Sequence, residues 1–420
     1  MRKMKDSGVE WIGEIPVDWK LSKIGSVYDE RKEKVSDKDF APLSVTKQGI
    51  VPQLETAAKT DNGDNRKLIR KDDFVINSRS DRRGSCGISE YEGSCSLINT
   101  VLKPQTNMCN RYYGFVFKSD GFADEYYRWG HGIVDDLWST KWIDMKSIYI
   151  PAPDITEQER IADYLNAKCS KIDEIIEKQQ AIIEKLKEYK LSIITEAVTK
   201  GINPNVEIKD SGIEWIGYIP KCWNISRFKY LSSEIGDGLH STPVYDSEGD
   251  YYFMNGQNIG NEKLVFSDKT DRLNELEYMK YKKPLLSENT IFITLNGATY
   301  GKSSFYNGEK VLLGKSAGYI TLKSSENKRY IRYYLQSRTA KIFMELSLCG
   351  STIANLSLKT LNEFIIPLPS EDEQRRIVDF LDVRCKLIDH NIDEKWKIVE
   401  KLQEYKKSLI YEVVTGKKEV

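Results

Sequence analysis

An arginine-rich run near residue 75 carries the clearest chemical signal in this chain. Residues 66–83 hold seven basic and three acidic side chains. An apolar segment at 74–77 leads directly into the polar loop 78–85. Arginine can bond guanine through two nitrogens, and serine or asparagine can bond adenine or phosphate. We therefore predict DNA contacts from Asn77, Ser78, Arg79, Ser80, Arg82, Arg83 and Ser85. A solvated basic loop is the simpler alternative.

Two polar loops in the second half of the chain are further candidates for contact with DNA. One lies at 236–242, and the other follows the apolar segment 290–295 in the same way that loop 78–85 follows 74–77. Both are rich in glycine and less basic than the first loop. Different residues at equivalent loops would read different bases. The side chains predicted to make contact are Asp237, His240, Ser241, Thr242, Asn296, Thr299, Tyr300 and Lys302.

Catalytic and metal-binding patterns are missing from the sequence. Its three histidines, His131, His240 and His390, are far apart, and no zinc-ligand spacing is present. The stretch 297–303 is one residue short of a phosphate-binding P-loop. We predict no catalytic residue and no metal site. Lys and Arg together balance Asp and Glu at 63 each, which argues against a polycation but leaves room for a local basic patch.

The elements that must position these loops are repeated along the chain. Residues 6–19 recur at 210–223 with ten of fourteen positions identical, and residues 151–200 recur at 367–416 with 24 of 50 identical. The segments between the matches are much less alike. Such a pattern indicates two tandem modules, each with a Trp-Ile-Gly opening segment, a divergent globular domain and a similar tail.

The two tails read as long helices. Apolar residues recur at steps of three and four, as in Ile172, Ile176 and Ile183 and again in Ile388, Ile392 and Val399. This spacing is typical of coiled coils, and we expect the two tails to pack on each other. The first tail is predicted to hold a short helix near 156 and a new one over 170–199. Capping boxes are predicted at 156–159 and 370–373.

The dissimilar segments between the repeats predict mixed α/β domains. Strands are expected at 74–77, 96–102, 290–295 and 318–322, and helices at 126–129 and 330–346. Each middle should close with a short strand that ends at a proline, at 148–151 and 364–367. The fold class is therefore α+β. Two mixed α/β domains are separated by two long antiparallel coiled-coil helical regions, in a pseudo-twofold internal repeat. The expected boundaries are 1–150, 151–205, 206–366 and 367–420.

These motifs together resemble the specificity subunit of type I restriction–modification enzymes. The resemblance rests on the Trp-Ile-Gly-x-Ile-Pro-x-x-Trp segments, the Pro-x-Pro…Glu-Gln-x-x-Ile tails and Val198-Thr-Lys-Gly201, and it covers essentially the whole chain. It implies a non-catalytic subunit with two target-recognition domains, each of which reads half of a bipartite site in double-stranded DNA. It also implies helices that space these domains.

The same resemblance implies partners. Two modification (methyltransferase) subunits would dock on the helical regions, and restriction (endonuclease/translocase) subunits would join them. S-adenosylmethionine, ATP and Mg would belong to those partners, with no cofactor in this chain. We predict scaffold or docking contacts from Glu157, Gln158, Arg160, Glu373, Gln374 and Arg376. Capping and packing within the chain is an equally good explanation for any one of them.

Two other functions are weighed against this one. A stand-alone coiled-coil DNA-binding regulator is the first alternative, and a nuclease or methyltransferase in its own right is disfavoured by the missing motifs. The sequence contains no apolar run long enough to predict a membrane span. None of the seven scattered cysteines forms a Cys-x-x-Cys pair, so we expect reduced thiols in a cytoplasmic protein.

Overall fold

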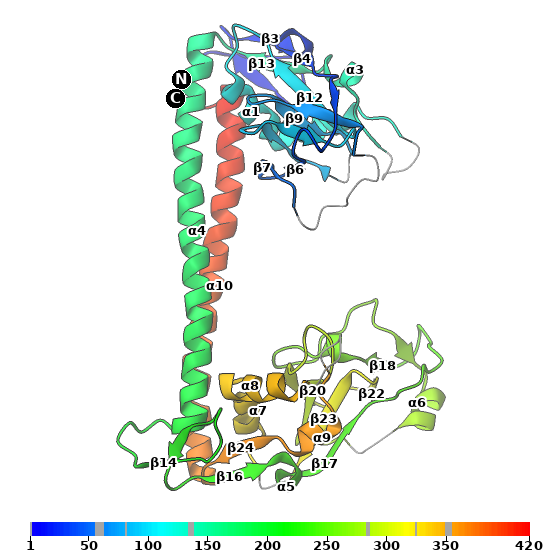
Figure 1. Cartoon of the computed structure of the whole chain (residues 1–420), viewed down its shortest axis with the longest axis vertical. Helices are drawn as coiled ribbons and strands as arrows, with labels where there is room; N and C mark the ends of the chain where they lie inside the picture. Colours follow the sequence, from blue (N-terminus) through cyan, green and yellow to red (C-terminus); the bar gives the residue numbers. More distant parts are fainter. Residues whose placement is uncertain are drawn as a thin grey trace. The chain divides into compact units, whose positions relative to one another are not determined.

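The chain is described by a computed structural model that covers residues 2–54, 63–79, 82–132, 138–282, 286–323, 326–348 and 355–420. It divides into two compact units. Unit 1 comprises Met1–Gln180 with Trp396–Val420, and unit 2 comprises Ala181–Lys395. Each unit contains one globular domain together with part of each long helix, α4 (Ile155–Lys200) and α10 (Glu371–Val414) (Figure 1).

Unit 1 is built on a four-stranded sheet with the order β10-β9-β12-β4. A three-stranded sheet, β11-β8-β5, and the strand pairs β1–β2, β3–β13 and β6–β7 complete its β structure. The strands are β1 (Met4–Asp6), β2 (Glu14–Pro16), β3 (Lys20–Lys23), β4 (Tyr28–Glu30), β5 (Lys34–Val35), β6 (Leu43–Thr46), β7 (Gly49–Pro52), β8 (Arg66–Ile69), β9 (Phe74–Asn77), β10 (Cys86–Ile88), β11 (Gly93–Cys95), β12 (Asn99–Pro104) and β13 (Tyr149–Ala152). Its helices besides α4 and α10 are η1 (Ile24–Ser26), α1 (Asn110–Lys118), α2 (Asp120–Arg128) and α3 (Trp142–Met145).

Unit 2 contains a four-stranded sheet of matching topology, with the order β21-β20-β23-β17. Its three-stranded sheet has the order β19-β18-β22, and β14–β15 and β16–β24 form pairs. The strands are β14 (Ile208–Asp210), β15 (Tyr218–Pro220), β16 (Asn224–Arg227), β17 (Ser232–Asp237), β18 (Tyr251–Met254), β19 (Arg272–Leu273), β20 (Thr290–Thr294), β21 (Ser303–Phe305), β22 (Val311–Leu313), β23 (Ala317–Leu322) and β24 (Ile365–Leu368). The helices are α5 (Phe228–Leu231), η4 (Gly256–Asn258), α6 (Glu275–Tyr281), α7 (Lys328–Gln336), α8 (Arg338–Ser347) and α9 (Leu358–Asn362).

The two four-stranded sheets correspond strand for strand, although their sequences differ. In each sheet the two strands that flank the long central one, β9 and β4 or β20 and β17, pair antiparallel with it. These flanking strands therefore run parallel to each other, and the loops that follow them leave the same end of the sheet. The loops from β9 to β10 and from β20 to β21 both span eight residues, 78–85 and 295–302.

The core of each unit forms where this sheet and a helix pair pack against the long helices. Buried Phe74, Phe117 and Phe122 contribute to the unit 1 core, together with Leu165 of α4 and Val413 of α10. Unit 2 is arranged in the same way, with Ile291, Tyr334 and Ile377 among its core residues. The predicted apolar stripe of the tails is thus buried against the domains as well as along the helix pair.

One pair of tyrosines shows that each tail ends on the domain of the other repeat. The Tyr112 hydroxyl donates to the carbonyl oxygens of Pro151 (3.3 Å) and of Val414, at the end of α10 (3.0 Å). In unit 2, the Tyr330 hydroxyl donates to Pro367 (2.8 Å) and to Val198, at the end of α4 (3.2 Å). Unit 1 therefore holds the start of α4 and the end of α10, and unit 2 holds the start of α10 and the end of α4.

Ion pairs along the long helices repeat this reciprocity. The Lys406 ammonium lies 2.6 Å from Asp173 in unit 1, and the Lys190 ammonium lies 2.6 Å from Asp389 in unit 2. Lys190 and Lys406 are equivalent in the tail repeat, and so are Asp173 and Asp389. The two ion pairs therefore join equivalent residues of the two tails, as expected for the predicted antiparallel, pseudo-twofold arrangement.

Several local predictions were wrong. Helix α4 is continuous from Ile155, so no helix starts at Ser170. Its first turn is capped by the Asp154 carboxylate, which accepts from the Glu157 N–H (2.9 Å), and not by Thr156. Residues 330–346 form two helices, because the Ser337 hydroxyl caps α8 by accepting from the Ala340 N–H.

None of the described cysteines forms a disulfide. Six of the seven lie in the described ranges, and all six are free. Burial raises the pKa of the Cys86 thiol to about 12 and that of the Cys95 thiol to about 11. Both thiols therefore stay protonated at neutral pH and are poor nucleophiles.

Candidate nucleic-acid interface

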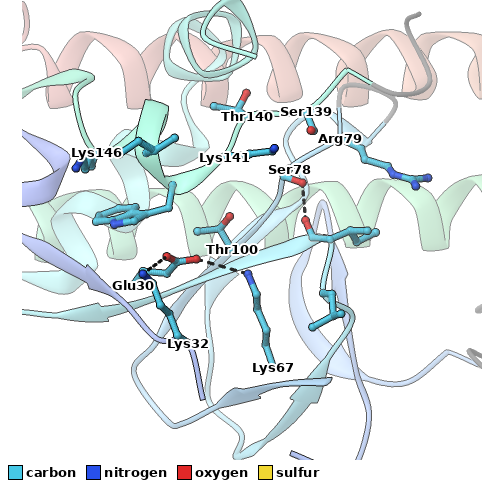
Figure 2. A pocket seen from close by; sticks show the side chains of 14 residues that line it. Glu30, Lys32, Lys67, Ser78, Arg79, Thr100, Ser139, Thr140, Lys141 and Lys146 are labelled. Atoms are coloured by element: carbon cyan, nitrogen blue, oxygen red, sulfur yellow. Dashed lines mark hydrogen bonds and ion pairs between the residues drawn. The ribbon is translucent and has the colours of Figure 1, made fainter. Parts of the chain in front are cut away.

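A basic hollow of 660 Å³ lies at the loop end of the four-stranded sheet in unit 1. We call it the unit 1 hollow. Five cationic side chains line it, whereas Glu30 is its only carboxylate among the described residues. Figure 2 shows Lys32 and Lys67 beside Glu30, with Arg79 on the other side of the hollow. The five cations are Lys32, Lys67, Arg79, Lys141 and Lys146.

Strand ends and a short helix hold these cations in place. Glu30 is the last residue of β4, and Arg79 lies two residues after the end of β9. Both strands finish at the same end of the sheet. The segment before α3 closes over this edge, since the Thr140 N–H donates to the Ser78 carbonyl (3.0 Å) and Arg79 bridges to Ser139. Lys141 is the N-cap residue of α3, and Lys146 is its C-cap residue.

The electrostatics of the unit 1 hollow favour an extended anion. The ammonium groups of Lys32 and Lys67 each lie 3.7 Å from Glu30, which is too far for a hydrogen bond. Lys32, Arg79 and Lys141 are exposed. One carboxylate cannot neutralise five cations, so the hollow keeps an excess of positive charge that attracts phosphates.

The described residues of the predicted loop 78–85 fall into two groups. Arg79, Arg82 and Arg83 are exposed, and Arg83 forms an ion pair with Asp124 on α2. Asn77 and Ser85 are buried, and the Asn77 amide oxygen accepts from the Arg79 N–H (3.1 Å). Neither side chain therefore faces solvent, and Asn77 holds the backbone of the loop. Ser80 lies outside the described residues, and Ser78 donates to the Ile98 carbonyl (2.5 Å).

Sequence reasoning missed most of the cations in the hollow. Lys32, Lys141 and Lys146 come from segments far from the arginine-rich run, and no motif surrounds them. Lys67 lies inside that run but was not selected. The position of Lys32 was the one clue, because it follows β4 at the same end of the sheet at which Arg79 follows β9. That the two strands finish at the same end becomes clear only from the strand order of the sheet.

Unit 2 presents a different surface at the equivalent sheet end. The predicted loops 236–242 and 296–303 leave this end together, because β17 and β20 flank β23 in parallel. Their bounds were slightly wrong, since Asp237 still belongs to β17 and Ser303 already belongs to β21. The His240 ring nitrogen lies 2.7 Å from the Asp237 carboxylate, and His240, Ser241 and Thr242 are exposed. In the other loop Thr299 and Lys302 are exposed, while Asn296 and Tyr300 are half-buried.

Glycine gives the unit 2 loop its tight shape. Gly297 and Gly301 have φ of 84° and 80°, a left-handed conformation that disfavours other residues. The Gly301 N–H donates to the Thr294 carbonyl (2.8 Å), which closes the turn. This surface offers amide, hydroxyl and imidazole groups with one lysine, so it suits hydrogen bonding to base edges more than charge attraction.

Most of the predicted docking residues are engaged inside their own units. The Glu157 carboxylate accepts from the Trp19 indole N–H (2.9 Å), and the Glu373 carboxylate accepts from that of Trp223 (2.9 Å). Gln158 bonds the Cys109 N–H and the Pro153 carbonyl. The Gln374 side chain is also buried and donates to the Pro369 carbonyl (3.0 Å). Only Arg160 and Arg376 of the six are exposed.

The part of the chain that the structure describes offers neither a metal site nor a membrane span. No group of three or more His, Cys, Asp or Glu side chains is arranged to hold a metal ion there. No described helix is both long enough and apolar enough to cross a membrane.

Comparisons with known proteins agree with this architecture. Residues 240–402 match the family described as type I restriction modification DNA specificity domain. The type I restriction enzyme MjaVIII specificity subunit of Methanocaldococcus jannaschii is 25% identical over 422 residues, which cover 96% of this chain and 93% of that protein.

Two solved structures share the fold. A chain from a structure of a type I restriction–modification system, solved to show complex assembly and conformational transition, aligns with a TM-score of 0.71 and 15% identity. It covers 95% of this chain and 98% of its own length. The HsdS subunit of Thermoanaerobacter tengcongensis aligns with a TM-score of 0.51 and 16% identity, over 96% and 98% of the two chains. With its two repeated units and its paired long helices, the chain is similar to the specificity subunits of type I restriction–modification systems.

Proposed function

We propose that this chain is the DNA-recognition subunit of a type I restriction–modification complex and that each unit reads one half of a bipartite DNA site. One observation carries the proposal. Two sheets of the same strand order present equivalent eight-residue loops, 78–85 and 295–302, with different side chains. A shared frame with different contact groups suits two different half-sites. Like the other specificity subunits, the chain has a non-catalytic role.

The role of a stand-alone coiled-coil DNA-binding regulator is not favoured. The MjaVIII relative matches 96% of this chain and is itself a subunit of a restriction enzyme. S-adenosylmethionine, ATP and Mg are assigned to partner subunits, as the resemblance to specificity subunits implies. This assignment is part of the proposal.

The long helices support docking of two modification subunits. Each tail has an exposed isoleucine–tyrosine pair at a spacing of seven residues, which puts both side chains on one helix face. Ile182 and Tyr189 are 38% and 54% exposed in unit 2, and the equivalent Ile398 and Tyr405 are 38% and 51% exposed in unit 1. Apolar side chains exposed at repeated positions mark protein-binding surfaces. Restriction subunits would join the complex through the modification subunits or beside them.

Selection from random DNA tests this function. The full chain is assembled with its modification subunit, and the bound DNA is recovered and sequenced. We expect two short defined sequences separated by a fixed stretch of unspecified bases. One continuous motif, or DNA without any shared motif, would contradict the proposal. The mass of the assembled complex tests the partners, since one modification subunit per chain at saturation would contradict two docking sites.

A further inference from the structure

A second hollow, in unit 2, contains a buried arginine with too few partners. We call it the Arg332 hollow; it has a volume of 630 Å³ and lies between α7, the edge strand β21 and α10. Arg332 is only 4% exposed. Within the described ranges its guanidinium makes one hydrogen bond, from Nε to the Ser303 carbonyl at 3.4 Å. A guanidinium has five N–H donors, and a buried charge without partners is costly.

The nearest carboxylate compensates Arg332 poorly. An oxygen of Glu262 lies 3.6 Å from the Arg332 guanidinium, and the Glu262 side chain is 73% exposed. Burial lowers the pKa of Arg332, and Glu262 opposes this only in part. The Arg332 Cζ lies over the Phe305 ring, 5.2 Å from its centroid, a contact that does not satisfy the guanidinium N–H groups. Among the described residues, the Arg332 guanidinium therefore has one carbonyl acceptor and one carboxylate beyond hydrogen-bond distance.

The equivalent place in unit 1 is filled. Tyr112 and Tyr330 make the same hydrogen bonds, so Gly114 of α1 corresponds to Arg332 of α7, two residues further on. The strand residue facing this position is Ile88 in unit 1 and Phe305 in unit 2. A Cβ on Gly114 would come within 2.9 Å of the Ile88 Cδ1, so a longer side chain there would require Ile88 to shift. The Arg332 hollow is thus specific to unit 2.

The charges around the Arg332 hollow exclude DNA and favour a single carboxylate. Its rim contains Glu262, Glu309 and Asp382 beside its four cations. Three acids oppose a polyanion such as duplex DNA, whereas Glu30 is the one acid that lines the unit 1 hollow in the part of the chain that the structure describes. Because Arg332 is almost fully buried, only a slender group can reach it. An aspartate or glutamate side chain fits both conditions and can bond a guanidinium through both oxygens.

The position of the hollow on α10 indicates which partner brings this carboxylate. Asp382 of α10 forms one wall, held by Arg329 (2.6 Å) and by the Tyr333 hydroxyl (2.7 Å). The next residue, Val383, is 69% exposed, and Leu387 one turn later is 54% exposed. A charged hollow beside exposed apolar residues on one helix is typical of a protein-binding surface.

We propose that the Arg332 hollow binds an acidic side chain of the modification subunit that docks on unit 2. This inference rests on the proposed function, because it requires that partner. It also makes the two docking sites unequal: both use exposed apolar residues of the long helices, but only the site on unit 2 has a buried ionic anchor.

Binding of the modification subunit to the full chain tests the proposal. Arg332→Gln should leave binding at the unit 1 site unchanged and weaken binding at the unit 2 site by roughly 10- to 100-fold, the effect of losing a hydrogen bond to a charged group. Arg338→Gln, an exposed arginine on the neighbouring helix α8, is the matched control and should change neither event. Titration calorimetry with native mass spectrometry separates the two events.

A second variant protects the test against misfolding. Glu262→Gln removes the resident acid that competes for Arg332, so it should tighten binding at the unit 2 site by a few-fold. A damaged fold cannot produce tighter binding. Unchanged binding in both variants would overturn the inference.

DNA binding separates the remaining outcomes. If Arg332→Gln instead lowers DNA affinity, the hollow holds a phosphate and the inference is wrong. If the wild-type chain selects no bipartite DNA site, the proposed function itself fails, whatever Arg332 does.

Discussion

Unit 1 and unit 2 share a frame and differ in the chemistry that the frame presents. Their four-stranded sheets have the same strand order, and their tyrosine and tryptophan contacts to the long helices are equivalent. At the loop end, however, unit 1 gathers five cations around one acid, whereas unit 2 presents glycine turns with amide, hydroxyl and imidazole groups. The comparison shows that buried contacts keep the frame constant while exposed loops vary freely.

Loss of a frame tryptophan should have the largest effect. Trp19 and Trp223 are 1% and 0% exposed, and each donates to a glutamate of the long helix in its unit. Trp19→Ala should cost unit 1 about 3–5 kcal/mol in free energy of unfolding, and Trp223→Ala should cost unit 2 the same. Hydrogen exchange at increasing denaturant measures each unit separately. Equal loss of protection in both units would show that the frames do not act independently.

Removal of Arg79 should change the reading of one half-site. If its guanidinium bonds a guanine through two nitrogens, Arg79→Ala should weaken binding by ~1–3 kcal/mol and relax one base position in one half-site only. Competition among sites with single base changes measures this. Arg128→Ala, at an exposed arginine of α2 outside the hollow, is the control. A loss spread evenly over all sequences would assign Arg79 to phosphate contact.

The dependence of DNA affinity on salt should differ between the units. Each phosphate contact contributes about 0.9 to the slope of log affinity against log salt. Lys141→Gln and Lys146→Gln in unit 1 should each lower that slope by about this amount, with the half-site sequences unchanged. Affinity measured at four or five salt concentrations gives the slope. An unchanged slope in both variants would place the DNA away from the unit 1 hollow.

The reciprocal ion pairs of the long helices should have the smallest effect. Asp173 and Asp389 are about half exposed, so solvent screens their attraction to Lys406 and Lys190. Asp173→Asn should cost ~0.2–1 kcal/mol, and Asp389→Asn a similar amount. A double-mutant cycle with the lysine partner isolates each pair. Clearly different coupling energies would show that the pseudo-twofold relation is only approximate at these positions.

Local pattern was enough to predict the repeated parts of the fold. The seven-residue stripe of Ile172, Ile183 and Val399 is buried, and the strands β9 and β20 lie where apolar runs indicated them. Their loops proved topologically equivalent. These features depend on residues close together in sequence, where periodicity and burial are directly linked.

Long-range features could not be predicted in this way. The unit 1 hollow needs Lys32, Arg79 and Lys141 to meet, and only the strand order brings them together. The N-terminal cap of α4 depends on Asp154, since the candidate Thr156 already lies within the first turn. The roles of Glu157 and Glu373 depend on tryptophans more than a hundred residues away. Such contacts follow from tertiary structure, which one sequence without a fold does not specify.

Unit 1 contains the end of α10, and unit 2 contains the end of α4. This arrangement has a consequence for synthesis on the ribosome. Unit 2 is one continuous stretch, Ala181–Lys395, so all of its residues have been made before the chain is complete. Unit 1 begins first, but its core includes Leu409, Val413 and Val414 near the end of the chain. The first domain to emerge is therefore the last to be finished. A product that stops early leaves the apolar face of that domain uncovered, where chaperones and proteases bind.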